Sequence, residues 1–263
     1  MTGGTKPTAP FRIGLALSGG AAKGFAHLGV LQALEEYGKH PDIIAGNSAG
    51  AIIAALYADG YRPEEISDLF LVRNFRAMTQ WQLPQKGFFE RSRFEDFLRA
   101  TLRHQFLEDL PLTVRIVATD LDRGAVKVFT TGPLVDIVMA SSCVSVLFNP
   151  VVIDGVTYVD GGLFKNLPVS VLRDDCQYLI GVHLNPEQPA EYKKNIIGIA
   201  ERSFAYIYRA NAMPDRELCD LLIEPCELSH FKLFSVESVR ELVAVGYQAA
   251  VHALNEASES HTP

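Results

Sequence analysis

The feature that most constrains the fold is a strand, glycine loop and helix unit that occurs twice in succession near the N-terminus. Residues 11–17 form a short apolar run closed by Ser-Gly-Gly, after which leucines recur at helical spacing until Gly38. Residues 42–47 form a second apolar run, and an apolar helix over 49–59 follows it, ended by Gly60. Because strand-to-helix alternation needs crossover connections, the pattern predicts a parallel sheet covered by helices.

The rest of the chain continues this alternation. Residues 62–106 show helical and loop patterns, and the stretch 91–106 places its apolar side chains on one helical face. Further on we expect strands at 113–119, 126–130, 178–184 and 221–224, a hairpin at 151–159, and helices at 134–141, about 190–213 and about 235–255. No repeat or linker interrupts the pattern, so we expect one α/β domain over residues 11–257, between flexible segments at 1–10 and 258–263.

Charge and cysteine content limit the class of protein. The 24 Lys and Arg residues against 31 Asp and Glu give a net charge of −7, which argues against nucleic-acid binding and makes any lipid contact apolar and local. The four cysteines lack metal-binding spacing, so we expect free thiols, no metal and no cofactor. With no signal-peptide pattern, and no apolar stretch near the roughly 20 residues of a membrane span, we expect a soluble cytoplasmic protein. The sequence does not indicate its oligomeric state.

A serine lies where the second predicted strand meets its helix. Residues 46–50 read Gly-Asn-Ser-Ala-Gly, a G-x-S-x-G pattern that arises by accident in about one chain in ten of this length. In a strand-to-helix elbow, Gly46 and Gly50 allow close backbone packing, and the helix N-terminus favours negative charge developing near Ser48. Ser48 is therefore a candidate nucleophile, although serine at such a position also serves as a simple helix N-cap.

The first glycine loop, residues 18–24, reads Ser-Gly-Gly-Ala-Ala-Lys-Gly. Such a loop can present backbone N–H groups to a dinucleotide, a phosphate or an oxyanion. It lacks the G-x-G-x-x-G spacing of dinucleotide sites, and Gly24 stands after Lys23 where a phosphate loop needs a hydroxyl. An oxyanion hole or a plain packing turn remains.

A candidate base follows the predicted hairpin. Asp160 ends an apolar strand and precedes two glycines, so its carboxylate can be held against a serine hydroxyl, although Asp-Gly is also a common turn signal. A conventional serine–histidine–acid triad would need His183 or His230, and neither lies in a recognisable triad setting. We interpret His27, on the helix after the glycine loop, as structural. The aromatic-rich region 75–89 is either a lid or lipid-contact segment or ordinary core.

Five ordered sequence blocks together resemble one family. The blocks GGAAKG, GNSAGA, ATDLDRG, MASSCVSVLFNPV and YVDGGLFKNLPV are similar to those of the bacterial patatin-like phospholipases, over about Ile13 to Pro168. The resemblance implies a three-layer α/β/α fold with a mostly parallel central sheet, and a Ser–Asp dyad. It assigns the nucleophile to Ser48, the base to Asp160, the oxyanion donors to the backbone of Gly19, Gly20 and Ala21, and the motif's basic position to Lys23.

Two positions depart from the family pattern. The family has a third glycine where Ala21 stands, and a proline where Ser145 stands. Because alanine tolerates positive φ poorly, Ala21 would distort the oxyanion loop if that conformation is required there. We expect the Ser145 change to affect the wall of a substrate pocket more than the chemistry.

The function that the resemblance implies is hydrolysis of lipid acyl esters, as by a phospholipase A-type esterase, through an acyl-enzyme intermediate. The expected partners are a lipid or ester substrate and, transiently, a membrane surface. Acyl transfer to an alcohol or thiol at the same site is an alternative that the sequence does not separate from hydrolysis. A catalytically weak lipid-sensing module is a second alternative, motivated by Ala21 and Ser145.

Overall fold

The computed structural model describes residues 9–72, 92–144, 149–184, 192, 194–231 and 239–259. Its strands are β1 (Phe11–Leu17), β2 (Ile43–Asn47), β3 (Thr113–Asp120), β4 (Ala125–Phe129), β5 (Val151–Ile153), β6 (Val156–Asp160), β7 (Cys176–Val182) and β8 (Leu221–Ile223). Its α-helices are α1 (Ala26–Glu36), α2 (Ala49–Ala58), α3 (Pro63–Val72), α5 (Ser92–Thr101), α6 (Leu134–Ser142), α7 (Ile196–Arg216) and α8 (Val239–Glu259). The short 3-10 helices η1 (Ala21–Phe25) and η3 (Gly161–Leu163) follow β1 and β6.

All these strands belong to one mixed sheet. Their order is β5-β6-β3-β2-β1-β7-β8, and β4 also pairs with β3. The central strands β1, β2, β3, β7 and β8 are parallel, whereas β4, β5 and β6 join by antiparallel pairing. The predicted α/β class with a mostly parallel sheet is confirmed, and the hairpin adds its antiparallel edge.

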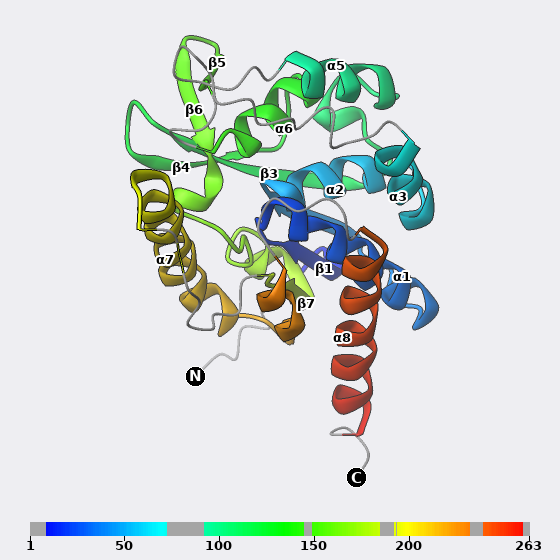
Figure 1. The fold of residues 1–263 in the computed structure, drawn as a ribbon. Coiled ribbons are helices and arrows are strands. Elements are labelled where there is room, and N and C mark those ends of the chain that lie inside the picture. The colour runs from blue at the N-terminus through cyan, green and yellow to red at the C-terminus, as the bar shows by residue number, and fades with distance from the viewer. Residues whose placement is uncertain are drawn as a thin grey trace, which may run out of the picture.

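Alternate residues of the central strands point into two cores, one on each face of the sheet. On β1, Leu15 and Leu17 enter the larger core, to which α1, α2, α6 and α8 contribute, whereas Ala16 enters a smaller one. Ala212 of α7 and Leu172, which lies just before β7, also belong to this smaller core. In Figure 1, α7 lies on the left of the sheet and α1 and α8 lie on the right. The arrangement is the expected three-layer α/β/α sandwich.

One edge of β3 carries two strands end to end, and this arrangement positions the site. The pairing of β2 ends with Asn47 opposite Val117, and that of β6 ends with Asp160 opposite Ala118, one residue further along β3. Since β4 occupies the other edge of β3 along this stretch, β2 and β6 share one edge and run toward each other. The elbow that follows Asn47 and the carboxylate of Asp160 are thereby brought together.

Some boundaries differ from those expected. The last helix was expected over about 235–255, whereas α8 runs from Val239 to Glu259, so 258–259 of the expected tail are helical. The turn η1 precedes α1, which the leucine periodicity did not indicate. The 75–89 segment and Ser145 lie outside the described residues. Among the helices that the structure describes, none is both long and apolar enough to cross a membrane.

Candidate active site

The strand-to-helix elbow holds Ser48 in a strained conformation. Ser48 has φ 52° and ψ −120°, a region that L residues other than glycine rarely adopt. It occupies the N-cap position of α2, but its side chain makes no capping hydrogen bond. A Cβ added at Gly46 would lie 2.6 Å from the Gly50 carbonyl oxygen, and one at Gly50 would lie 2.3 Å from that of Leu17. The two glycines therefore permit the tight elbow, and the serine hydroxyl is left for another role.

The Asp160 carboxylate lies beside that hydroxyl. Ser48 acts to lower the pKa of this carboxylate, and its Oδ1 accepts the N–H of Gly162 at 2.7 Å. Asp160 is only 1% exposed, and this burial raises its pKa to about 6, although Ser48 and the Gly162 N–H both act in the opposite direction. A carboxylate with such a pKa is ionised at neutral pH and can still accept a proton. The fold therefore places Ser48 and Asp160 side by side, where β2 and β6 meet on β3.

The glycine loop lies directly against the serine. A Cβ at Gly19 would be 3.2 Å from the Cβ of Ser48, so only glycine fits between them. The Gly19 N–H, however, donates to the carbonyl oxygen of Asn166 at 3.1 Å. Of the three predicted donors, Gly20 and Ala21 are those whose N–H groups have no protein partner in the described part of the chain. Ala21 does adopt positive φ, at 48°.

Two serines of α6 fix the backbone of the elbow, and the sequence analysis did not single them out. The Ser141 hydroxyl accepts the Ser48 N–H at 2.9 Å and donates to the Val117 carbonyl oxygen at 2.7 Å. The neighbouring Ser142 hydroxyl donates to the Ser48 carbonyl oxygen at 3.4 Å. Both lie in the MASSCVSVLFNPV block, and membership of that block is the sequence feature that could have pointed to them. They tie the backbone of Ser48 to α6 and β3.

A family model described as patatin-like phospholipase matches residues 15–173, more than half of the chain, and this span contains the glycine loop, Ser48 and Asp160. The chain belongs to the patatin-like phospholipase family. An uncharacterized NTE family protein of Mycobacterium tuberculosis is 32% identical over 177 residues, which are 66% of this chain and 49% of that protein. The human patatin-like phospholipase domain-containing protein 6 is 32% identical over 169 residues, 61% of this chain and 12% of its own length.

The chain thus spans about half the length of its mycobacterial relatives, and a much smaller part of the human one. Among solved structures, VipD from Legionella pneumophila has a similar fold, with a TM-score of 0.56 at 15% identity. That likeness covers 96% of this chain and 67% of VipD. At this identity it bears on the fold alone, and it agrees with the patatin-like α/β arrangement described above.

Lys23 and the histidines considered above as catalytic or structural residues lie in the following settings. Lys23, the motif's basic residue, is 8% exposed, and burial lowers its pKa. His27 is buried, its Nε2 lies 2.9 Å from the Ser18 carbonyl oxygen, and its pKa is lowered to about 4 by burial, so it is neutral at pH 7. His183 at the end of β7 pairs through Nδ1 with Glu224 at 2.7 Å. The side chain of His230 lies outside the described part. Within that part, no cluster of three or more His, Cys, Asp or Glu residues is arranged to hold a metal ion.

Proposed function

We propose that this chain is a serine acyl hydrolase that acts on lipid esters, with Ser48 as nucleophile and Asp160 as base. The observation that carries the proposal is that the end-to-end meeting of β2 and β6 on β3 places the strained Ser48 elbow beside the buried Asp160 carboxylate. The pKa of Asp160, about 6, suits a group that must accept a proton at neutral pH and return it. Membership of the patatin-like phospholipase family supports the substrate class.

The proposed reaction proceeds through an acyl-enzyme. Asp160 takes the proton of Ser48 as Oγ attacks the ester carbonyl carbon, and the N–H groups of Gly20 and Ala21 stabilise the resulting oxyanion. The carbon–oxygen bond to the alcohol then breaks, and the leaving oxygen receives the proton from Asp160. Water, deprotonated by the same carboxylate, attacks the acyl carbon, the bond from that carbon to Ser48 Oγ breaks, and Asp160 returns the proton to Oγ as the carboxylic acid leaves.

A dyad fits this chain better than a triad. In a triad the histidine contacts the serine, and a carboxylate orients the histidine. Here the carboxylate of Asp160 lies beside Ser48 itself, and His183 is bonded to Glu224, which also pairs with Arg216 at 2.6 Å. We therefore propose that no histidine takes part. Retained activity in Asp160→Ala, or loss of activity in a folded His183→Ala protein, would point to another base.

A fluorophosphonate probe and an ester panel test the proposal together. Wild type should be labelled by the probe and should hydrolyse p-nitrophenyl esters and phospholipids, and Ser48→Ala should lose both activities. Ser203→Ala, at an exposed serine of α7, is the matched control and should behave as wild type. Equal labelling of wild type and Ser48→Ala contradicts the catalytic assignment, and absence of wild-type labelling favours the lipid-sensing alternative. Product analysis with an added alcohol acceptor separates acyl transfer from hydrolysis.

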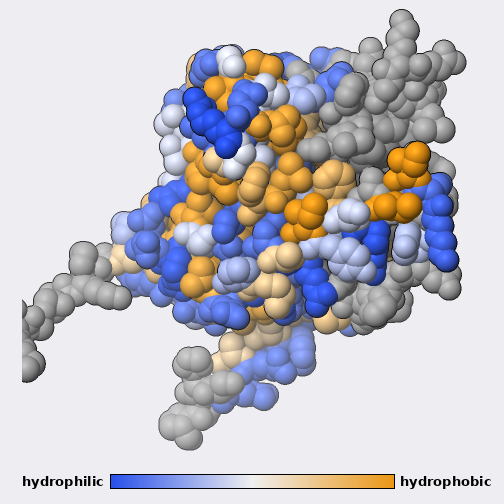
Figure 2. All heavy atoms as spheres, turned by 90° about the vertical axis from the view of Figure 1, so that its left-hand side faces the viewer, coloured by the Kyte–Doolittle hydropathy of each residue, from blue (hydrophilic) through white to orange (hydrophobic). Residues whose placement is uncertain are grey.

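The outer side of α7 supports contact with a lipid surface as part of this function. Figure 2 shows apolar side chains gathered on the face that carries α7. Ile196 is 87% exposed, and four more exposed apolar residues follow it at helical spacing; this α7 stripe comprises Ile196, Ile199, Tyr206, Ile207 and Met213. The cationic residues Lys194, Arg202 and Arg209 lie beside it in a chain of net charge −7. We propose that the α7 stripe docks on an anionic lipid surface.

The position of α7 relates this surface to the site. The opposite side of the helix packs on η3, directly after the base, where a Cβ added at Gly162 would lie 3.0 Å from the Tyr208 ring. A bilayer that contacts the α7 stripe would therefore be held one helix diameter, about 10 Å, from the base turn. This distance is small enough for a lipid to reach the site without leaving the surface entirely.

A further inference from the structure

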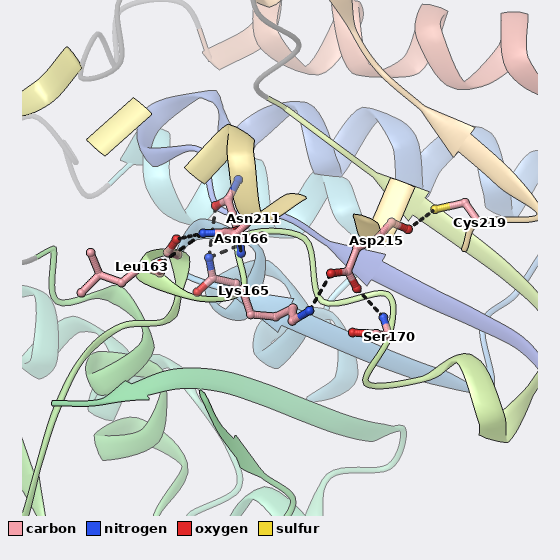
Figure 3. A network of polar contacts seen from close by, with 9 residues as sticks. Leu163, Lys165, Asn166, Ser170, Asn211, Asp215 and Cys219 are labelled. Carbon is pink, nitrogen blue, oxygen red and sulfur yellow. Dashed lines mark hydrogen bonds and ion pairs between the residues drawn. The ribbon is translucent and has the colours of Figure 1, made fainter. Parts of the chain in front are cut away.

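Three buried or half-buried asparagines lie behind the site and connect the segments that carry its chemistry. Asn47 ends β2 immediately before the nucleophile, Asn166 lies in the segment that follows η3, and Asn211 lies on the inner side of α7. We call these three residues the asparagine clamp. Figure 3 shows Asn166 and Asn211 facing each other between α7 and the segment after the base.

Asn166 makes contacts in three directions. Its carbonyl oxygen accepts the Gly19 N–H at 3.1 Å, which ties the oxyanion loop to it. Its Oδ1 accepts Nδ2 of Asn47 at 3.3 Å, next to the nucleophile. Its backbone N–H donates to Oδ1 of Asn211 at 2.7 Å. One fully buried residue therefore touches the oxyanion loop, the elbow and α7.

Asn211 completes the connection to the base. Its Nδ2 donates to the carbonyl oxygen of Gly162 at 2.7 Å and to that of Leu163 at 3.2 Å. The N–H of the same Gly162 donates to Oδ1 of Asp160. The orientation of the base is thus set by a turn that Asn211 holds, while the other end of the same amide holds Asn166.

The amides of the clamp also fill the space left by two glycines. A Cβ at Gly19 would lie 2.7 Å from Oδ1 of Asn166 and 2.8 Å from Nδ2 of Asn47. A Cβ at Gly161 would lie 2.5 Å from Oδ1 of Asn47. The Asn47 and Asn166 side chains therefore fix how closely the oxyanion loop and the base turn approach the elbow.

The asparagine clamp lowers the stability of the folded state, so a purely structural role for Asn47 and Asn166 is a poor explanation. Oδ1 of Asn47 and Nδ2 of Asn166 are buried and have no hydrogen-bond partner among the described residues of the chain. A buried polar atom without a partner destabilises the folded state, and an apolar pair of similar shape would avoid that penalty. Buried amides that share one hydrogen bond, leave their other polar atoms unpaired, and still contact the oxyanion loop, the elbow and α7 indicate selection for geometry.

We propose that Asn166 and Asn211 are positioning residues that keep the Gly20 and Ala21 N–H groups in register with Ser48 and Asp160. The inference rests on the proposed acyl-hydrolase function. Neither asparagine touches the reacting atoms in this scheme, since each acts through backbone groups of the loop or turn. Displacing donors or base by about 1 Å typically slows catalysis by up to a hundredfold.

A second anchor from α7 onto the same segment supplies a matched control. Asp215, one turn along from Asn211, bonds Nζ of Lys165 at 2.7 Å and the backbone N–H of Ser170, as Figure 3 shows. It is 1% exposed, and it contacts neither the oxyanion loop nor the elbow. Asp215→Asn should therefore weaken the attachment of α7 without changing the geometry at Ser48.

The experiment compares Asn166→Ala, Asn211→Ala and Asp215→Asn by ester kinetics, fluorophosphonate labelling rate and thermal melting. We expect kcat to fall about tenfold to a hundredfold in both asparagine variants, with KM within about threefold of wild type. In Asp215→Asn the Tm should fall while kcat stays within about twofold. The acid limb of the pH profile should move upward in Asn211→Ala only, because the Gly162 N–H then holds the Asp160 carboxylate less well.

The outcomes separate this inference from the proposed function. Asparagine variants that melt earlier but keep wild-type kcat and pH profile overturn the inference, as does an equal loss of kcat in Asp215→Asn. If an alanine variant does not fold, Asn211→Asp replaces it; this variant keeps the acceptor for Asn166, loses the donor to Gly162, and should still slow labelling per folded molecule. Wild-type activity that survives in Ser48→Ala contradicts the proposed function instead, whatever the asparagine variants do.

Discussion

At the scale of single residues, the burial of Asp160 governs how the proposed activity depends on pH. The base must be ionised to accept the proton of Ser48, and burial raises its pKa to about 6. We expect kcat/KM for an uncharged ester to be constant above about pH 7 and to fall about tenfold per pH unit well below pH 6. Rates measured between pH 4.5 and 8.5 test this, and a plateau that extends down to pH 4.5 would contradict the assignment.

The same burial has a consequence for stability with a defined sign. The folded-state pKa of Asp160, about 6, exceeds the ordinary aspartate pKa of 3.8, so the folded state binds the proton more tightly and loses stability as the pH rises through this window. Two pKa units correspond to about 3 kcal/mol. Asp160→Asn, which lacks this charge, should be more stable than wild type at pH 8 by up to about 3 kcal/mol and equal to it at pH 4. Urea unfolding at both pH values measures the difference.

Ala21 carries backbone strain that a glycine would relieve. At φ 48° an alanine is disfavoured by about 1 kcal/mol, whereas glycine adopts this conformation readily. Ala21→Gly should therefore raise the free energy of unfolding by about 0.5–1 kcal/mol and keep or increase kcat. Ala22→Gly is the matched control and should lower stability by a similar amount, because Ala22 lacks positive φ. If the two variants change the free energy of unfolding in the same direction, Ala21 does not carry backbone strain that glycine relieves.

The two residues proposed as nucleophile and base were predictable from the sequence, whereas the residues that hold them in place were not. Ser48 and Asp160 each lie beside glycines in short motifs, so their local setting is visible in the order of residues. Asn47 and Asn166 are 119 positions apart, and Asn166 and Asn211 are 45 apart, so only the folded sheet brings them together. The glycine loop is an intermediate case, because its motif is visible in the sequence but one of its contacts is not. The hydrogen bond from the Gly19 N–H to the Asn166 carbonyl oxygen forms only when the chain is folded.

At the scale of elements, α1 and α8 cross at two glycines that allow their backbones to touch. A Cβ at Gly246 would lie 2.0 Å from the carbonyl oxygen of Ala26, and one at Gly29 would lie 1.9 Å from that of Val243. The contact matters to the site because α1 also carries His27, which bonds the Ser18 carbonyl oxygen at the start of the glycine loop.

This crossing reverses the usual effect of alanine in a helix. A glycine-to-alanine change inside a helix normally stabilises by about 1 kcal/mol. Gly246→Ala should instead destabilise by about 2 kcal/mol or more, because the clash is with backbone and the two helices must move apart. Gln248→Ala, at an exposed position of α8, should change stability by less than about 0.5 kcal/mol. Chemical denaturation of both variants checks this, and a stabilised Gly246→Ala protein would show that the crossing is looser than described.

The spacing of apolar residues predicted which segments form helices and strands, but it did not predict the order of the strands in the sheet. The apolar runs at Phe11–Leu17 and Ile43–Asn47 and the Asp-Gly hairpin at residues 151–159 are local signals, and each forms a strand where expected. The end-to-end meeting of β2 and β6 on one edge of β3 depends on register between distant strands, which no local pattern encodes. That meeting brings Ser48 beside Asp160, and neither motif by itself indicates that the fold joins them there.

At the scale of the whole molecule, α7 has two sides with different tasks. Its inner side carries Tyr208, Asn211 and Asp215, which pack on or bond the segment after the base. Its outer side carries the α7 stripe, which is exposed although its residues are apolar. A helix that is apolar on its solvent side usually marks a surface meant to be covered, and the neighbouring cations favour an anionic bilayer as the cover.

The triple variant Ile196→Ser, Ile199→Ser, Ile207→Ser tests this surface on the whole chain. Partitioning onto vesicles of equal phosphatidylcholine and phosphatidylglycerol should fall at least tenfold, since each isoleucine contributes about 1 kcal/mol on partial insertion. Hydrolysis of a short soluble ester should stay within about twofold of wild type, because the stripe points away from Ser48. Val152→Ser, at a 64% exposed residue of β5, is the control and should bind vesicles as wild type does. Unchanged partitioning of the triple variant would show that the α7 stripe binds something other than lipid. If that partner is a second copy of this chain, wild type should sediment as a larger species, and the triple variant should not.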